Sequence, residues 1–488
     1  MADSHEDRML IDGKLVAAES GKTFANLNPA TEQQIGRAAD GSAGDVDRAV
    51  AAARRAFDET DWSTDRAFRA RCLRQLQDAI VGELELFRQE IIDEVGAPRA
   101  LTKATQLEGA LAEALLWPAA FIDEFCWERD LGVGEFLGRK SRRMVVKEPV
   151  GVVGAIVPWN YPMETTLSKL GPALATGNTV VLKPAPDTPF SATRLGRLAA
   201  EQTDLPAGVL NIVTSSDHLV GEALVTDPRV DLISFTGSTA TGMRIMEKGA
   251  PTLKRLFLEL GGKSANIILD DADFGLYVQG AVAGVCSHAG QGCVIATRLL
   301  VPRGRYADAV DQAAAALERV RYGDPNDPDV IMGPLISAKQ RDRVLGYVEI
   351  GVAEGARLVT GGHRAPAFER GYFVEPTLFA DVRNDMRIAR EEIFGPVLAV
   401  IPYEDEDDAV RIANDSPYGL GGAVASADPD RALAVAKRLR TGVVRVNGND
   451  WYGAASPFGG YKRSGLGRQN GLEGFEQYLE TKTLGLPL

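Results

Sequence analysis

Four short runs of apolar, mostly β-branched residues lie between residues 152 and 236, and each run ends in a turn. They are VVGAIV (152–157), TVVLK (179–183), GVLNIV (208–213) and VDLISF (230–235). Helix-compatible segments follow most of them. Strands that are buried on both faces have this composition, so the sequence predicts an open parallel sheet with crossover helices.

The alternation of strands and helices continues through the second half of the chain. A second series begins with RLFLELGGKSANIIL at residue 255 and includes VLAVIPY and GVVRVN further on. The chain has 488 residues, more than one hydrophobic core usually serves, so we expect two or three domains. Near the N-terminus, Asp45 is expected to cap a helix with the apolar face Val46, Ala49, Val50, Ala53 and Phe57.

Composition argues against several classes of protein. The net charge is -13 and the pI is about 5.1, so the basic face of a general nucleic-acid binder is not expected. The longest fully apolar stretch, near GVVGAIVPW, is too short to span a bilayer. The first residues, MADSHEDRML, lack the regions of a signal peptide. We therefore expect a cytoplasmic protein without a nucleic-acid or membrane partner.

Four cysteines stand at positions 72, 126, 286 and 293, and none belongs to a CxxC pair. Disulfides are not expected in the cytoplasm. Cys286 and His288 fit no standard zinc spacing and have no fourth ligand nearby, so no metal site is expected. A nucleophilic pair of a cysteine with His288 stays an alternative.

The segment AGQGC places Cys293 between small residues. Gly290 and Gly292 would leave its sulfur little guarded, and backbone amides near a helix start would lower its pKa and hold an oxyanion. A buried thiol at a tight turn fits this segment equally well. Glu259 favours the first interpretation, because a carboxyl group in apolar surroundings has a raised pKa and can act as a general base. A helix-capping role for Glu259 is the alternative.

Two glycine-rich turns are candidates for phosphate binding. In FTGSTATG (235–242), backbone N–H groups at the next helix start can hold a phosphate, and Gly237 allows close approach. The same spacing also fits an ordinary strand–helix turn. LGGKS (260–264) does not complete a P-loop, because Phe257 stands where that motif needs a glycine.

Seven motifs together resemble one family. PWNYP, LKPA, FTGSTATG, LELGGKS, GQGC, EEIFGPV and SPFGGYKRSGLGR stand here in the order found in the aldehyde dehydrogenase superfamily. The resemblance runs from about residue 10 to the C-terminus. The chain looks most like the NAD(P)-dependent branch that oxidises aldehydes to free acids.

The resemblance implies a role for each matching residue. Cys293 would be the nucleophile, Asn160 and the backbone N–H of Cys293 would stabilise the oxyanion, and Glu259 would activate the hydrolytic water. Lys183 would bind the adenine-side ribose, Ser238 the pyrophosphate and Glu392 the nicotinamide ribose. The implied cofactor residues are Ile156, Trp159, Lys183, Gly237, Ser238, Leu260, Glu392 and Phe394. The implied substrate residues are Tyr161, Glu164, Trp451, Tyr452 and Phe458, a wall that suits an apolar or aromatic aldehyde, while Glu164 could favour a cationic one.

The resemblance also implies an α/β fold in three parts. A Rossmann-like NAD-binding domain would comprise residues 1–125 and 147–258, and a catalytic α/β domain residues 259–472. A small β element for oligomerisation would comprise residues 126–146 and 473–488. An exposed strand can extend a neighbour's sheet, so a homodimer or homotetramer is expected.

The sequence departs from the family pattern on the adenosine side. The lysine motif usually has Glu three residues after the lysine, whereas this chain has Pro186 followed by Asp187. Asp187 could turn inward as a substitute, or cap a helix that starts near Thr188. The turn TSSDH (214–218) stands where a glycine-rich turn is usual. We therefore expect NAD as the preferred cofactor and NADP as a weaker one.

Two other hypotheses remain besides hydrolytic aldehyde oxidation. An acylating relative would pass the thioester to coenzyme A, but it would not need Glu259 as a base. A catalytically silent binding or structural protein on the same scaffold would not need Asn160, Glu259 and Cys293 together.

Overall fold

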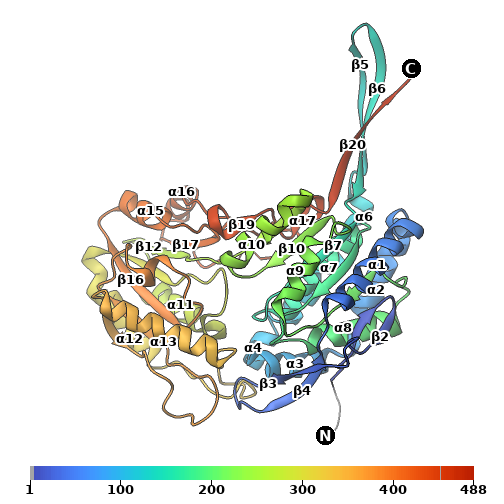
Figure 1. The fold of residues 1–488 in the computed structure, drawn as a ribbon. Helices are drawn as coiled ribbons and strands as arrows, with labels where there is room; N and C mark the ends of the chain where they lie inside the picture. Colours follow the sequence, from blue (N-terminus) through green and yellow to red (C-terminus); the bar gives the residue numbers. More distant parts are fainter. Residues whose placement is uncertain (1–4, 451) are drawn as a thin grey trace.

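The structure is a computed structural model that describes residues 5–450 and 452–488, so Trp451 lies outside the described residues. It consists of two α/β lobes side by side and a narrow β arm that projects away from them (Figure 1). The C-terminus lies along this arm. Among the described residues, no helix is long and apolar enough to cross a membrane.

The first lobe is built on a mostly parallel sheet with the strand order β19-β11-β10-β7-β8-β9-β1-β2. The central strands β11, β10, β7, β8 and β9 run parallel to one another. The outer strands β19, β1 and β2 are antiparallel to their neighbours. The strands are β1 (Met9–Ile11), β2 (Lys14–Val16), β7 (Val152–Ile156), β8 (Thr179–Lys183), β9 (Leu210–Ile212), β10 (Leu232–Thr236), β11 (Arg255–Glu259) and β19 (Gly465–Leu466). The four predicted runs thus form β7 to β10, in one parallel sheet.

Both faces of this sheet are covered, which explains the continuous apolar runs. Successive strand residues point to opposite faces. In β7, Val153 and Ala155 join one core cluster, whereas Val152 joins the cluster on the other side. The helices of this half of the chain are α1 (Ala43–Glu59), α2 (Arg66–Gly82), α3 (Leu84–Val95), α4 (Arg99–Thr102), α5 (Glu108–Glu113), α6 (Leu116–Glu124), α7 (Pro162–Ala175), α8 (Phe190–Gln202), α9 (His218–Thr226) and α10 (Thr239–Gly249).

The start of helix α1 differs from the expectation. Asp45 is not the N-cap, because the helix begins at Ala43 and Ser42 caps it. Asp45 is the third helical residue, and its carboxylate accepts a hydrogen bond from the Ser42 backbone N–H at 2.8 Å. The two residues satisfy each other's terminal backbone groups in a capping box.

The second lobe has the strand order β14-β15-β16-β13-β12-β17-β18, parallel except for β14. Its strands are β12 (Ala265–Ile268), β13 (Arg298–Pro302), β14 (Arg357–Thr360), β15 (Thr377–Ala380), β16 (Val397–Tyr403), β17 (Gly421–Ala425) and β18 (Val443–Val446). Its helices are α11 (Phe274–Cys286), α12 (Tyr306–Leu317), α13 (Ala338–Ala353), α14 (Arg387–Arg390), α15 (Glu406–Asn414) and α16 (Pro429–Ala436). One large apolar cluster packs between these helices and the sheet.

The arm is a sheet of β20 (Leu479–Leu486), β6 (Arg139–Pro149) and β5 (Glu128–Phe136), in that order, next to helix α17 (Gly471–Glu476). Its tip exposes large apolar side chains, with Phe136 71% and Leu137 85% exposed. A separate two-stranded sheet, β3 (Thr23–Leu27) with β4 (Gln34–Ala39), lies at the base of the first lobe.

Candidate active site

Cys293 lies between two cavities. A cavity of about 440 Å³ and another of about 240 Å³ both include Cys293 in their lining, together with Tyr161, Glu164 and Phe458. Cys286 lines neither cavity, because it is buried at the end of α11. Burial raises the pKa of the Cys286 thiol to about 12. Of these two cysteines, only Cys293 therefore lines a cavity.

The environment of Cys293 differs from the expectation of a helix start. Cys293 sits in a turn between a 3-10 helix (Ser287–Gly290) and β13, so no helix begins at this residue. Burial, and next the carboxyl group of Glu259, raise the pKa of Cys293 well above its usual value. The resting thiol is therefore protonated at neutral pH, and a base is needed to generate the thiolate.

Glu259 supplies a carboxyl group within reach of that thiol. It ends strand β11, is only 2% exposed, and lines the smaller cavity together with Cys293. Burial raises the pKa of Glu259, which suits a group that gains and loses a proton near neutral pH. Its Oε1 has no hydrogen-bond partner among the described residues. The residue is part of the lining of the smaller cavity.

The glycines around Cys293 serve different purposes. A side chain on Gly290 would collide with the backbone oxygen of Gly395, so this glycine allows close backbone packing and does not open a path to the sulfur. Gly292, in contrast, lines the larger cavity. Just before them, His288 and Ala289 adopt left-handed backbone angles, with φ of 50° and 52°. Such angles are costly for residues with a Cβ, so the surrounding structure must hold this segment in place.

Asn160 is held at the opposite wall, at the turn between β7 and α7. Its Nδ2 donates to the Gln291 backbone oxygen at 2.9 Å, and its own backbone oxygen accepts from Gln106 Nε2 at 2.8 Å. Gln291 is fixed in turn, since its Oε1 accepts from the Ile336 backbone N–H at 2.9 Å. Nδ2 carries a second hydrogen, and Asn160 is part of the lining of the smaller cavity. Sequence reasoning missed Gln106 and Gln291 because they act only through Asn160.

The smaller cavity gathers five of the implied cofactor residues: Trp159, Gly237, Ser238, Glu392 and Phe394. Ser238 caps helix α10, as expected for a strand–turn–helix. Glu392 Oε1 accepts from the Gly262 backbone N–H at 2.9 Å, and burial raises the pKa of Glu392 to about 7. Phe394 and Trp159 meet edge to face, with ring centroids 5.5 Å apart.

Three of the implied cofactor residues, Ile156, Lys183 and Leu260, do not line this cavity. A methyl group placed on Gly221 of α9 would touch the Lys183 side chain at 3.4 Å and that of Ile156 at 4.0 Å, so these two residues lie together beside α9. Leu260 packs against Gly242 of α10. Burial lowers the pKa of Lys183 to about 8, while Asp217 and Asp40 oppose that shift.

Asp187 does not cap the helix that follows it. The helix after it, α8, begins at Phe190, and Glu94 accepts the backbone N–H groups of Phe190 and Ser191 at 2.7 and 3.3 Å. Burial raises the pKa of Asp187 and lowers that of Lys183, while the charge of Lys339 opposes the shift at Asp187 and the charges of Asp217 and Asp40 oppose the shift at Lys183. The unusual TSSDH turn thus brings an acid to Lys183, since Asp217 caps α9 and Ser216 binds Asp40.

The larger cavity is lined by four of the five implied substrate residues, Tyr161, Glu164, Tyr452 and Phe458. Trp451 lies outside the described residues. The Glu164 carboxyl group accepts hydrogen bonds from Tyr452 Oη at 2.6 Å, Ser168 Oγ at 3.2 Å and Gln469 Nε2 at 3.3 Å. Burial raises the pKa of Glu164.

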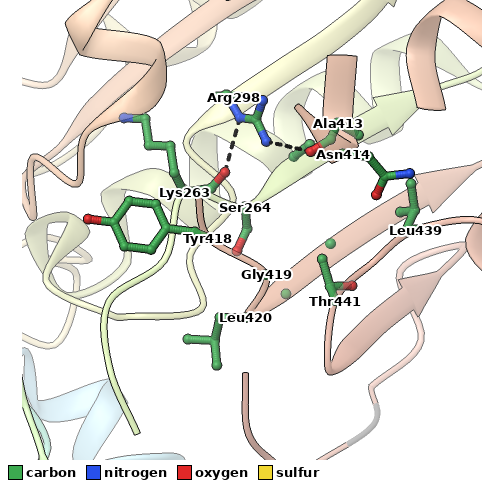
Figure 2. A pocket seen from close by; sticks show the side chains of 13 residues that line it. Lys263, Ser264, Arg298, Ala413, Asn414, Tyr418, Gly419, Leu420, Leu439 and Thr441 are labelled. Carbon is green, nitrogen blue, oxygen red and sulfur yellow. Dashed lines mark hydrogen bonds between the residues drawn. The ribbon is translucent and has the colours of Figure 1, made fainter. Parts of the chain in front are cut away.

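A third cavity, of only about 10 Å³, lies behind the LGGKS turn (Figure 2). It is about as large as one water molecule, so it is no substrate site. The buried Arg298 beside it donates to the Lys263 backbone oxygen at 3.0 Å and to the Ala413 oxygen at 3.0 Å (Figure 2). These bonds tie the turn that follows Glu259 to β13 and to the end of α15.

Comparison with known proteins identifies the family. The model of the aldehyde dehydrogenase family matches residues 15–484. The chain belongs to this family. It is 43% identical to the 3-succinoylsemialdehyde-pyridine dehydrogenase of a Pseudomonas species, over 97% of both chains. It is also 43% identical to the geranial dehydrogenase of Castellaniella defragrans, over 98% of both chains.

A solved structure is equally similar. An alanine variant of aldehyde dehydrogenase C from Pseudomonas syringae, in complex with NAD+ and octanal, superimposes with a TM-score of 0.93. It shares 40% identity, over 99% of this chain and 98% of that one. The aldehyde dehydrogenase described here is an NAD-dependent enzyme that oxidises aldehydes to carboxylic acids.

The smaller cavity of this aldehyde dehydrogenase fits a polar ligand such as the nicotinamide end of NAD. Thr236 Oγ1 and Glu259 Oε1 are buried atoms without a partner among the described residues, and both residues line the cavity. A Cβ on Gly261 would meet Glu392 Oε2, so the backbone at Gly261 lies very close to the Glu392 carboxyl group. The N-terminus of α10 adds free backbone N–H groups at Ser238, where an anionic group binds well.

The aldehyde dehydrogenase also has lining residues that sequence reasoning missed. The larger cavity includes Thr105, Asn266, Tyr277, Gly280, Gly284 and Arg445, and the smaller one includes Gln340, Arg343 and Gln469. One signal was available, because small residues at 280, 281 and 284 have the spacing of one helix face. The others carry no motif of their own.

Proposed function

We propose that Cys293 is the nucleophile of this aldehyde dehydrogenase and that Glu259 is its base. The observation that supports this most strongly is that Cys293 lines both cavities and shares the lining of the smaller one with Glu259. The aldehyde would enter through the larger cavity and the nicotinamide would occupy the smaller one. Trp159, Gly237, Ser238, Glu392 and Phe394 would hold the nicotinamide half of NAD, and Ile156, Lys183 and Leu260 its adenosine half.

In the first half-reaction, Glu259 takes the proton of the Cys293 thiol, and the sulfur bonds to the carbonyl carbon. The carbonyl oxygen becomes an oxyanion, which Asn160 Nδ2 and the Cys293 backbone N–H would stabilise. Each such donor lowers the barrier by roughly 3 kcal/mol. NAD, when bound, accepts the hydride that leaves the adduct carbon, and the adduct becomes a thioester.

In the second half-reaction, Glu259 first releases the thiol proton to solvent. It then takes a proton from water, and the resulting hydroxide attacks the thioester carbon. The carbon–sulfur bond breaks, the carboxylic acid is released, and the Cys293 thiolate regains a proton. Water needs this activation, whereas coenzyme A brings its own thiol. The presence of Glu259 therefore favours hydrolysis over acyl transfer to coenzyme A.

We infer that the substrate is an apolar or aromatic aldehyde. Tyr161, Tyr277, Tyr452 and Phe458 line the larger cavity, and burial raises the pKa of Glu164, which disfavours its charged form. Octanal bound to one relative and the geranial named for another are apolar aldehydes of this kind.

We further propose NAD as the preferred cofactor and NADP as a weaker one. Asp217 and Asp40 face Lys183 and would repel the 2'-phosphate of NADP, a role that Pro186 cannot fill. The division into domains stays a prediction, with residues 1–125 and 147–258 for the cofactor and residues 259–472 for catalysis. A homodimer or homotetramer that forms through the arm also stays a prediction. Location in the cytoplasm also stays a prediction.

The test compares the two neighbouring thiols. Cys293→Ala should abolish NADH formation from propanal while NAD still binds, because the nucleophile is lost. The matched control, Cys286→Ala, should keep most of the activity, because that thiol lines neither cavity. An active Cys293→Ala enzyme would refute the proposal. Product analysis with and without coenzyme A decides between free acid and acyl-coenzyme A.

A further inference from the structure

The larger cavity has a row of aligned residues along one wall. In the parallel pairing of β12 with β17, Asn266 lies opposite Ala423, and in the pairing of β17 with β18, Ala423 lies opposite Arg445. All three residues line the cavity. Aligned residues on neighbouring strands point to the same face, with roughly 4.8 Å between strands. The amide of Asn266 and the guanidinium of Arg445 therefore flank a small residue that leaves space between them.

Arg445 faces into the cavity as well as toward solvent. Its side chain is half exposed, and its charge reaches Tyr161, where it opposes the rise in the Tyr161 pKa that burial causes. Its nitrogen lies 3.8 Å from a carboxylate oxygen of Asp450, which lines the same cavity. The loose ion pair carries no net charge, and a guanidinium has five N–H donors, so one carboxylate does not saturate it.

The wall formed by α11 leaves room for a long or bulky group. Gly280 and Gly284 lie one helical turn apart and line the cavity, and a Cβ on either would meet no atom within 4 Å. Tyr277, on the same helix face, adds an aromatic surface. Cys293, this face of α11 and the row of Asn266, Ala423 and Arg445 thus line one cavity.

We propose that Asn266 and Arg445 form a subsite for a neutral hydrogen-bond acceptor, such as a ketone, on the tail of the aldehyde. The inference rests on the proposed function, in which the aldehyde carbonyl lies at Cys293. A neutral acceptor bonds to the free donors and leaves the pair of Arg445 and Asp450 intact. A carboxylate would compete with Asp450 for the guanidinium and suffer its repulsion. The preferred substrates are therefore aldehydes with an apolar body and a distant carbonyl-type oxygen.

The experiment uses aldehydes of equal chain length. The kcat/KM is measured for nonanal, for its 5-, 6-, 7- and 8-oxo derivatives and for 9-oxononanoate, each divided by the value of the same protein for propanal. In wild-type enzyme, one of the oxo derivatives should exceed both nonanal and 9-oxononanoate. In Arg445→Met and Asn266→Ala, that advantage over nonanal should shrink by roughly 5- to 30-fold, the size of one hydrogen bond to a charged or polar group.

The matched control is Arg357→Met. Arg357 lies on β14 of the same sheet, is also half exposed and also pairs with an aspartate, Asp381, but it does not line the cavity. Its substitution should leave the ratios unchanged. Arg445→Gln, which keeps a donor, should retain part of the advantage and serves if Arg445→Met fails to fold.

Two results would overturn the proposal. One is an oxo-to-nonanal ratio that does not change in Arg445→Met and Asn266→Ala. The other is a wild-type preference for 9-oxononanoate, since the subsite would then bind an anion. Failure of the proposed function is recognised separately, because Cys293→Ala would then still oxidise propanal.

Discussion

The two cavities that meet at Cys293 are built in different ways. In the smaller one, backbone groups fix the polar atoms: Gly262 N–H holds Glu392, and the start of α10 carries Ser238. In the larger one, the size of the side chains determines the shape. Gly280 and Gly284 have no side chain, so their face of α11 leaves space in the cavity. The first arrangement binds one fixed ligand, whereas the second can change its ligand with a single substitution.

The comparison separates chemistry from selectivity. Substitutions of Cys293 or Glu259 should slow the oxidation of every aldehyde to the same extent. Changes in the larger cavity should alter the ranking of aldehydes, and changes near Lys183 should alter the ranking of cofactors. A substitution near Lys183 that alters the ranking of aldehydes, or one in the larger cavity that alters the ranking of cofactors, would contradict this division.

After the loss of Cys293, the largest effect is expected at Glu259. Glu259→Gln keeps the size of the side chain but cannot accept a proton from water, so hydrolysis of the thioester should slow by roughly 10²- to 10⁴-fold. Stopped-flow measurement should show a burst of NADH followed by a slow steady state. The loss should be similar for propanal and nonanal. Unchanged turnover would remove Glu259 from the mechanism.

A smaller effect, confined to bulky substrates, is expected at Gly284. In Gly284→Val, the new side chain would occupy the space beside α11, and kcat/KM for an aromatic aldehyde such as 3-phenylpropanal should fall by roughly 10- to 100-fold relative to propanal. Gly346→Val on α13 is the control, because a Cβ there also meets no atom within 4 Å but lies outside the cavity. An equal loss for both aldehydes would contradict a role in selectivity.

The pH dependence of the thiol provides the next test. The raised pKa of Cys293 means that its thiolate fraction, and so its alkylation by iodoacetamide, increases as pH rises. Glu259→Gln removes the nearest negative charge, which lowers the pKa, so the alkylation profile should shift to lower pH by about one unit. The exposed Cys126 is replaced by alanine in both proteins to avoid its own reaction. A shift to higher pH would contradict this account.

The smallest effect is expected at the adenosine end. Asp217→Asn keeps the helix cap but removes a charge that faces Lys183, so the NADP-to-NAD ratio of kcat/KM should rise by roughly 5-fold, or about 1 kcal/mol. Asp187→Asn should leave the ratio unchanged, because Asp187 faces Lys339. A change in this ratio for Asp187→Asn, with none for Asp217→Asn, would support the expectation from the sequence that Asp187 turns inward toward the ribose.

The fold was predictable where one local pattern determines one element. The apolar runs match β7 to β10, since strands covered on both faces require such runs. Motifs likewise indicated the residues that now surround Cys293. The row of Asn266 and Arg445 was not predictable, because strand register brings these distant residues together. The acids beside Lys183 were missed for a similar reason, since a turn and a separate loop supply them.

The most direct test of the central claim is to find the acyl group on the enzyme. Glu259→Gln is mixed with propanal and NAD, quenched in acid and digested with trypsin, and the peptide of residues 264–298, which contains both Cys286 and Cys293, is fragmented in a mass spectrometer. The account predicts a propionyl group on Cys293 and an unmodified Cys286. A propionyl group on Cys286, or an unmodified Cys293 after a burst of NADH, would contradict it.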